Sequence, residues 1–256
     1  MSEEKLKIYV CCHKDYEDVG INNSCYKIIT CKDIKNNSSL EMIKIDSELD
    51  DRMWSELASI YHIWKHPELQ AEYIGLCHYR RYFNFMNDVP TEFDKPIIPK
   101  RLSSAFNNYI TYDLCHNSKD LFGLMRIIHT DLKDYSPAMR VMSDSHFYFP
   151  YNMFIFSKEL FNTYCEFLFG ALLKFDEKIG VKNDYNKMIQ HIADYREFYV
   201  ERDSYPNNTY EYQARLYGFL AERMSTAFIM KYIHEHGEDS INETEVTITE
   251  KTYNKI

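Results

Sequence analysis

The sequence predicts an α/β fold: a central sheet flanked by helices, with a helix-rich C-terminal half. Three observations support this prediction. Short apolar runs with β-branched residues end in polar loops in the first hundred residues, apolar residues recur at helical spacing between them, and the segments beyond residue 117 are mostly helical in pattern. Strands followed by helices are typical of an α/β core. We find no internal repeat and no linker, so residues 1–256 are expected to form a single domain.

The first elements are two strands and a loop. Residues 7–12 (Lys-Ile-Tyr-Val-Cys-Cys) are short, apolar and partly β-branched, as in a buried strand, and a polar loop follows at 16–24. Residues 26–30 repeat this pattern and predict a second strand. Residues 32–50 are rich in Asn, Ser and Asp, which predicts a surface loop.

A helix and a third strand come next. Asp50 or Asp51 can cap a helix whose apolar residues follow i, i+3, i+4, i+7 spacing, and His66 with the following proline ends it. Residues 72–77 predict a strand that runs directly into His-Tyr-Arg-Arg-Tyr-Phe at 78–83.

The rest of the chain predicts mainly helices. The expected segments are a loop at 84–95, a short strand at 95–99, a helix over 117–142 broken at Pro137, an extended stretch at 147–156, helices over 159–169, 174–200 and 213–234, a turn at 204–208 and a strand at 244–249.

Composition excludes several functional classes. The chain has 30 Lys and Arg against 39 Asp and Glu, a net charge of −9, so we expect no nucleic-acid partner. Its seven cysteines show no CxxC spacing, which favours reduced thiols. No apolar run is long enough to span a membrane, and the first residues lack the apolar stretch of a signal peptide, so we expect a cytoplasmic protein.

The most informative segment is the predicted strand that ends just before Arg80 and Arg81. Ligands of open α/β sheets bind beyond the carboxyl ends of strands, and two permanently charged planar guanidinium groups suit a diphosphate. Flanking tyrosines can stack on a base or a sugar ring. Alternatively, the two arginines bridge surface carboxylates of an acidic protein. Adjacent strand residues point to opposite faces, so we expect one arginine to face any given ligand.

Two further pairs of polar residues are candidates. His13 and Lys14 end the first strand in the same manner, or lie in a solvated loop. His116 and Asp120 fall on one face if their segment is helical, where they are an acid/base pair, a metal pair or a helix cap.

Three polar residues within apolar patterns complete the set. Glu222 and Arg223 lie inside a strong helical pattern, as a solvated pair or, if Glu222 points inward, as a general base beside an arginine. Asn152 enters an apolar strand, where a polar residue often makes a specific hydrogen bond. The motifs GxxxxGK[ST], GxGxxG, GxSxG and HExxH are absent, and no convincing DxD is present.

At this point the motifs resemble those of a known family. The string Tyr-Ile-Gly-Leu-Cys-His-Tyr-Arg-Arg-Tyr-Phe at 73–83 and Gly-Phe-Leu-Ala-Glu-Arg at 218–223 are similar to the hallmarks of a bacterial family once labelled as a domain of unknown function. Its members occur in capsular and exopolysaccharide gene clusters and are regarded as glycosyltransferases. The matching segments run in order from about residue 5 to 232. The other matching segments are 8–14, 54–65, 116–120, 151–155 and 161–169.

The resemblance implies a GT-A-like (Rossmann-like) fold and transfer of a hexose from a nucleotide sugar. UDP-hexose is the expected donor, with UDP-galactofuranose as a candidate, and the acceptor is a glycan or lipid-linked glycan of capsular or exopolysaccharide synthesis. Residues 1–100 are then the nucleotide-binding part and 101–256 the helix-rich acceptor side. A lipid-linked acceptor implies transient contact with the inner face of the membrane or with an assembly complex.

The roles that we assign follow from this resemblance. Inverting transfer needs a carboxylate base, for which Glu222 is the first candidate and Asp120 the second; retention is the alternative outcome. The donor-binding candidates are His13, Lys14, His78, Tyr79, Arg80, Arg81, Tyr82, His116, Asn152 and Arg223. In GT-A folds, a strand near the sheet centre carries the metal-binding DxD motif, and the comparable strand here carries cationic side chains. We therefore favour metal-independent transfer and firmly predict no cofactor; dependence on Mn²⁺ or Mg²⁺ is the alternative.

Two other functions compete with this interpretation. The first is a non-catalytic module that binds sugar nucleotides with the same fold. The second is a metal-dependent phosphohydrolase that uses His116 and Asp120.

Overall fold

A computed structural model describes residues 5–90, 92–195 and 209–249. Its main sheet places the strands in the order β10-β6-β9-β4-β1-β2-β3. The parallel strands of the N-terminal part are β1 (Leu6–Cys11), β2 (Tyr26–Thr30), β3 (Glu41–Lys44) and β4 (Tyr73–His78). This arrangement confirms the predicted α/β class with a central Rossmann-like sheet.

The second half of the chain adds strands to the same sheet. β9 (Phe154–Ser157) runs antiparallel to β4, and β6 (Ile97–Pro99) runs antiparallel to β9. The remaining strands are β10 (Asn242–Thr244) beside β6, β5 (Arg81–Phe83) in a hairpin with β4, β11 (Val246–Ile248) beside β5, and a separate ribbon of β7 (Leu102–Ser103) and β8 (Phe147–Tyr148).

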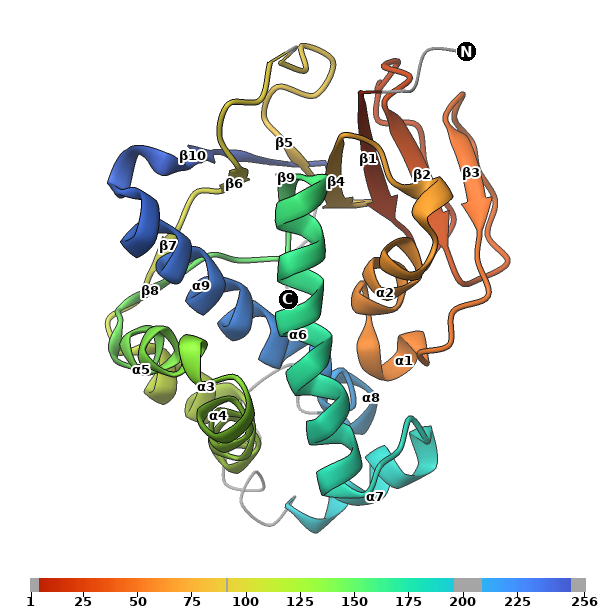
Figure 1. Cartoon of the computed structure of the whole chain (residues 1–256). Coiled ribbons are helices and arrows are strands. Elements are labelled where there is room, and N and C mark those ends of the chain that lie inside the picture. The colour runs from red at the N-terminus through yellow and green to blue at the C-terminus, as the bar shows by residue number, and fades with distance from the viewer. Residues whose placement is uncertain (1–4, 91, 196–208, 250–256) are drawn as a thin grey trace.

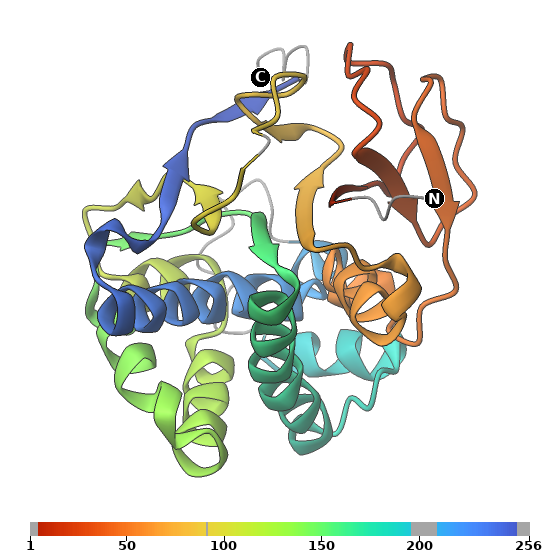
Figure 2. The same ribbon diagram turned by 45° about the horizontal axis from the view of Figure 1, so that its top comes forward.

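The helices gather on one side of the sheet, and the long α6 and α9 cross each other beneath it (Figures 1 and 2). The α-helices are α1 (Asp51–Trp54), α2 (Leu57–Lys65), α3 (Asn108–Cys115), α4 (Ser118–Asp131), α5 (Ser136–Asp144), α6 (Lys158–Ile179), α7 (Tyr185–Asp194), α8 (Tyr210–Gln213) and α9 (Leu216–His236). Short 3₁₀ turns are η1 (Pro67–Leu69), η2 (Lys133–Tyr135) and η5 (Glu238–Ser240).

The two faces of the sheet have different covers. Side chains alternate along a strand, so Tyr9 and Cys11 of β1 join the core shared with the helices, whereas Ile8 and Val10 face the opposite way. On that second face the cover is loop, including Tyr16 and other apolar residues of the connections after β1 and β2.

Two elements differ from their predictions in the first half. The segment 32–50 contains β3, whose residues are mostly exposed at the edge of the sheet, so no apolar pattern marks it. The helix that begins at Asp51 breaks into α1 and α2, because Ser55 adopts a left-handed backbone (φ 52°). Asp50 caps α1 and His66 ends α2, as predicted.

The helical second half also differs in its boundaries. The break expected at Pro137 lies earlier, at η2, because the proline fits the first turn of α5 without losing a hydrogen bond. α6 continues through 174–179 and ends at Gly180, which adopts a left-handed backbone (φ 77°). The predicted turn at 204–208 and the end of the helix predicted over 174–200 lie outside the described residues.

Candidate functional site

The site lies at the carboxyl ends of β1 and β4. These strands are parallel neighbours with Cys11 opposite His78. The next strand after β1 lies toward one edge of the sheet, and the next strand after β4 lies toward the other edge. Such a reversal of strand order is where open α/β sheets bind ligands. The two strand ends touch: the rings of His13 and Tyr79 meet edge-on with centroids 4.9 Å apart, and the Tyr79 amide donates to the Cys11 carbonyl at 3.1 Å.

Arg80 and Arg81 turn toward different rings. Arg80 lies over Tyr79, with its Cζ atom 5.0 Å from the ring centroid, and Arg81 lies over Tyr151 at 4.5 Å. The Nε atom of Arg81 is buried without a hydrogen-bond partner, and within the described part of the chain Arg81 forms no ion pair. A half-buried guanidinium without a carboxylate partner is ready to bind an anion.

The histidine and the lysine that follow β1 lie beside these arginines. His13 and Lys14 both have exposed surface. Desolvation, followed by the positive charges of Arg215, Lys32, Lys14 and Arg80, lowers the pKa of His13 to about 4, although the residue keeps contact with solvent. His13 is therefore a neutral hydrogen-bonding group at pH 7.

The turn of Tyr151 and Asn152 faces the same edge. Both residues have left-handed backbones, with φ of 74° and 50°, which costs roughly 1–2 kcal/mol at Tyr151, whereas Asn is a residue type that tolerates this conformation. The Tyr151 carbonyl accepts a hydrogen bond of 2.6 Å from Nε2 of His78, which fixes that ring as a donor. The Tyr151 amide donates to Oε1 of Glu222 at 3.0 Å. One strained turn thus connects the end of β4 to helix α9.

Within the described chain, Glu222 is one of two carboxylates, with Glu56, that accept hydrogen bonds from this turn. Its Oε2 atom pairs with Nη1 of Arg223 at 3.0 Å, and 22% of its side chain remains exposed. Burial raises the pKa of Glu222, as does the charge of Glu56, while Arg223, the Tyr151 amide and Arg81 oppose the increase. A carboxylate with a raised pKa and some exposure is a suitable proton acceptor.

Tyr82 and Arg223, both predicted to bind the donor, are buried. Tyr82 has no exposed surface, and its hydroxyl donates to the Tyr79 carbonyl and is hydrogen-bonded to the Tyr16 hydroxyl. Arg223 is 6% exposed, pairs with Glu222, and lies near the rings of Tyr112 and Tyr148. Burial leaves these two side chains little surface for direct contact with a donor.

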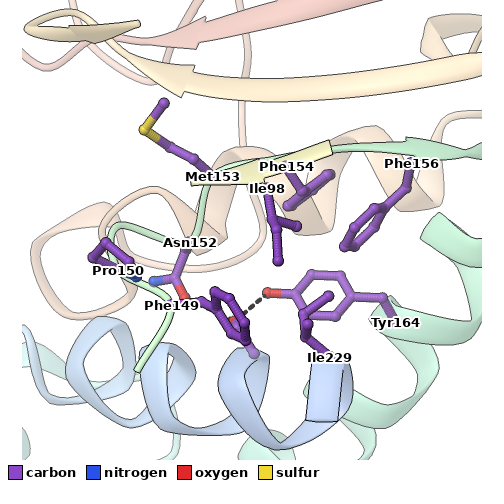
Figure 3. Close-up of a pocket in the computed structure, with 10 residues that line it drawn as sticks. Ile98, Phe149, Pro150, Asn152, Met153, Phe154, Phe156, Tyr164 and Ile229 are labelled. Atoms are coloured by element: carbon purple, nitrogen blue, oxygen red, sulfur yellow. Dashed lines mark hydrogen bonds between the residues drawn. The ribbon is translucent and has the colours of Figure 1, made fainter. Parts of the chain in front are cut away.

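Asn152 is the centre of a buried hydrogen-bond chain. Its amide donates to Oε1 of Glu56 at 2.6 Å, its carbonyl accepts from Ser225 at 3.0 Å, and Ser225 meets the Tyr164 hydroxyl at 2.8 Å. A cavity of about 10 Å³ next to this chain is too small for a substrate (Figure 3). Asn152 therefore shapes the turn and holds Glu56, and its 2% exposure leaves little surface for a ligand.

His116 and Asp120 do not form the expected pair. His116 ends α3 in an extended conformation and lies outside α4, so the two side chains do not share a helical face. Nδ1 of His116 bonds Gln213 at 3.0 Å, and burial lowers the pKa of His116 to about 3. Asp120 bonds Nε2 of His191 at 3.0 Å instead. His116 packs beside the first turn of α9 through Phe219, at a ring distance of 4.0 Å.

Three residues of the site were not predicted. Arg215 donates to the Ser55 hydroxyl at 3.0 Å and forms no ion pair within the described residues, and its charge acts on both His13 and His78. Glu56 and Tyr151 reach the site through the broken helix and the strained turn. A usable signal exists for Arg215 alone: it precedes Phe219 and Glu222 at i, i+4 and i+7 spacing on one helical face.

The described residues include no group of three His, Cys, Asp or Glu side chains that could hold a metal ion. In the same part of the chain, no helix combines the length and the apolar character needed to cross a membrane.

Comparisons with known proteins place this site in context. The apo structure of WbbM, a bifunctional glycosyltransferase, superposes with a TM-score of 0.73 at 22% identity, over 98% of this chain. The chain spans 46% of the WbbM chain, less than half its length, and at this identity the likeness concerns the fold. No curated protein matches the sequence. Residues 7–198 match the family described as Domain of unknown function (DUF4422). That match covers well over half of the 256 residues, so the chain belongs to this family.

Proposed function

We propose that this protein is a glycosyltransferase that moves a hexosyl group from a nucleotide-sugar donor to a glycan acceptor. One observation carries the proposal: Arg81, without an ion-pair partner in the described chain, lies with Arg80 at the strand-order reversal, and Glu222 lies across Tyr151 from it. The fold shared with WbbM, itself a glycosyltransferase, is consistent with this assignment.

The cations are suited to the diphosphate of the donor. Arg80, Arg81 and Lys14 follow two neighbouring strand ends, and Arg215 adds positive charge from α9. Negative charge grows on the diphosphate as the bond to the sugar breaks, so a preorganised guanidinium stabilises the transition state more than the ground state. Neutral His13 and Tyr79 can donate hydrogen bonds beside them. UDP-hexose is the donor that we propose, with UDP-galactofuranose as a candidate.

Glu222 is the proposed base. The acceptor hydroxyl gives its proton to the Glu222 carboxylate while its oxygen attacks the anomeric carbon, and the bond from that carbon to UDP breaks on the opposite face. The electron pair leaves with UDP, and the configuration inverts. The raised pKa of Glu222 makes its ionised form a stronger base. Asp120 has no place in this scheme, because its partners are Asn117 and His191.

A divalent metal fits this edge poorly. His78, Tyr79, Arg80 and Arg81 occupy the end of β4, and two guanidinium groups repel a second cation. We therefore propose that arginines perform the neutralisation and route no step through a metal.

The biological setting rests on the family resemblance alone. We propose a glycan or lipid-linked glycan of capsular or exopolysaccharide synthesis as the acceptor, with transient contact at the inner face of the membrane or in an assembly complex.

A thermal-shift panel tests the donor. UDP, GDP, CMP and their sugar conjugates are compared with EDTA or with Mn²⁺, since a ligand at 100-fold excess over its Kd stabilises the fold by about 2.7 kcal/mol. We expect a UDP-specific shift that persists in EDTA. A shift that requires Mn²⁺ would refute the role of the arginines, and the absence of any nucleotide shift would refute the donor. Binding without release of UDP in the presence of acceptors would favour the non-catalytic module.

A further inference from the structure

The first turns of α9 expose one stripe of side chains. Between residues 215 and 223, only Arg215, Phe219 and Glu222 are half-buried, and every other residue is buried. Their i, i+4, i+7 spacing places them on one face of the helix. α9 begins against α1, with Gly218 next to Ser55, so this stripe starts at the broken helix and leads to the proposed base.

Aromatic rings border this stripe. Tyr212 of α8 lies 5.1 Å from Phe219 between ring centroids, and the Arg223 guanidinium lies 4.9 Å from the ring centroid of Tyr148 on β8. Tyr148 and Tyr212 are both half-buried. Arg223 also pairs with Glu222 at 3.0 Å, so one guanidinium links the Tyr148 ring to the carboxylate.

Phe219 is held in place before any ligand arrives. His116 stacks against Phe219 with centroids 4.0 Å apart, and Gln213 holds His116 by a hydrogen bond of 3.0 Å. Gln213 in turn donates to the Cys115 carbonyl at 3.0 Å. A ring that is already held by packing loses little freedom when a ligand contacts its exposed part.

The chemistry of this surface favours a sugar. A sugar ring has an apolar face that packs on an aromatic ring and hydroxyls that bond to charged groups at its edge, and here Arg215 and Glu222 border Phe219. A lipid tail would gain nothing from these charges. The negative charge of Glu222 also disfavours a second phosphate at this position.

We propose that Tyr148, Tyr212 and Phe219 form the acceptor subsite, in which a sugar ring of the acceptor glycan stacks with one hydroxyl directed at Glu222. This inference rests on the proposed function and adds the second substrate to it. Glu222 is then linked to both subsites, because its partner Tyr151 lies under Arg81 and its partner Arg223 lies over Tyr148.

Saturation-transfer difference NMR tests the subsite directly. The probes are methyl β-galactopyranoside, methyl β-glucopyranoside, methyl α-mannopyranoside and N-acetylglucosamine, each with and without UDP. We expect at least one to receive saturation from the wild-type protein. Phe219→Leu and Tyr212→Leu, which keep apolar volume but remove the aromatic face, should weaken that probe by roughly tenfold while the UDP affinity stays within about twofold.

Phe122→Leu is the matched control, because Phe122 is 57% exposed on α4 and belongs to neither proposed subsite. Melting temperatures verify that each variant is folded. The inference is overturned if no probe binds the wild-type protein, or if both Leu variants bind as the wild-type does. Failure of UDP to bind the wild-type protein would instead refute the donor assignment, so the two outcomes are separable.

Discussion

Two carboxylates of this protein differ in their access to solvent. Asp120 is 3% exposed, and its two oxygens bond His191 at 3.0 Å and Asn117 at 3.1 Å. The two oxygens of Glu222 also have partners, the Tyr151 amide and Arg223, but its side chain is 22% exposed and its pKa is raised. It also lies near Arg81, whose Nε atom has no hydrogen-bond partner among the described residues. Asp120 is therefore closed to a ligand, whereas Glu222 and Arg81 keep charge within reach of a substrate, which is how a site differs from a structural pair.

The largest expected effect is on turnover when Glu222 loses its charge. We expect Glu222→Gln to lower kcat by about 10²–10⁴-fold with little change in donor affinity, because the amide cannot accept the acceptor proton. In the wild-type protein the acid limb of kcat/KM should lie above pH 4.5, since the pKa of Glu222 is raised. UDP release in the presence of acceptor measures both. A variant with wild-type turnover would remove Glu222 from the role of base.

Replacing Arg81 should have the next largest effect. We expect Arg81→Gln to weaken UDP binding by roughly 30- to 100-fold, because a charge-assisted contact to phosphate contributes about 2–3 kcal/mol. Arg101→Gln is the matched control, because Arg101 already pairs with Glu243 of β10. Titration calorimetry of both variants decides the point, and equal affinities in the two would contradict the diphosphate site.

Asp120→Asn should lower the stability of the protein and leave its activity nearly unchanged. The substitution removes the carboxylate that bonds His191 in a buried contact. We therefore expect the free energy of unfolding to fall by about 2 kcal/mol. Neither kcat nor the donor KM should change by more than about twofold when assayed below the melting temperature. Denaturant unfolding and steady-state kinetics on the same preparation separate the two effects. A loss of kcat comparable to that of Glu222→Gln would erase the comparison.

The smallest effect is on the pH dependence of stability through His116. Its pKa in the fold is about 3, below the 6.5 of the unfolded chain, so its stabilising contribution is present above pH 6.5 and is lost as the pH falls. Between pH 6.5 and 5.5 it should amount to about 1 kcal/mol. Urea unfolding at both pH values should therefore show a steeper loss for the wild-type protein than for His116→Gln. Equal losses would show that folding does not lower the pKa of His116.

Sequence patterns predicted the parts of the molecule that depend on neighbouring residues. The strand that ends at His78 and the long helix around Glu222 are encoded by local apolar spacing, and both were predicted with nearly correct boundaries. β3 was missed because its exposed edge carries no such spacing, and β5 because three residues become a strand only by pairing with β4 and β11.

Parts of the site that depend on distant contacts could not be predicted. Glu56 joins it because Ser55 breaks a helix and Asn152 arrives from a turn 96 residues away. Tyr and Arg are common at surfaces and at binding sites, so residue type does not predict that Tyr82 and Arg223 are buried. Their burial depends on contacts with residues that are distant in the sequence. His116 and Asp120 were paired on the assumption of one continuous helix, and Asn117, which caps α4, removes that assumption.

The long separations within the site bear on how the chain folds. Arg215 meets Ser55 across 160 residues, and Glu222 meets Tyr151 across 71. Such contacts form slowly, and α9 is synthesised after the rest of the site. A nascent chain that has released only its first half therefore exposes arginines without their carboxylate. Ligand affinity is then a measure of completed folding, and a refolding experiment should recover nucleotide binding only when α9 has docked.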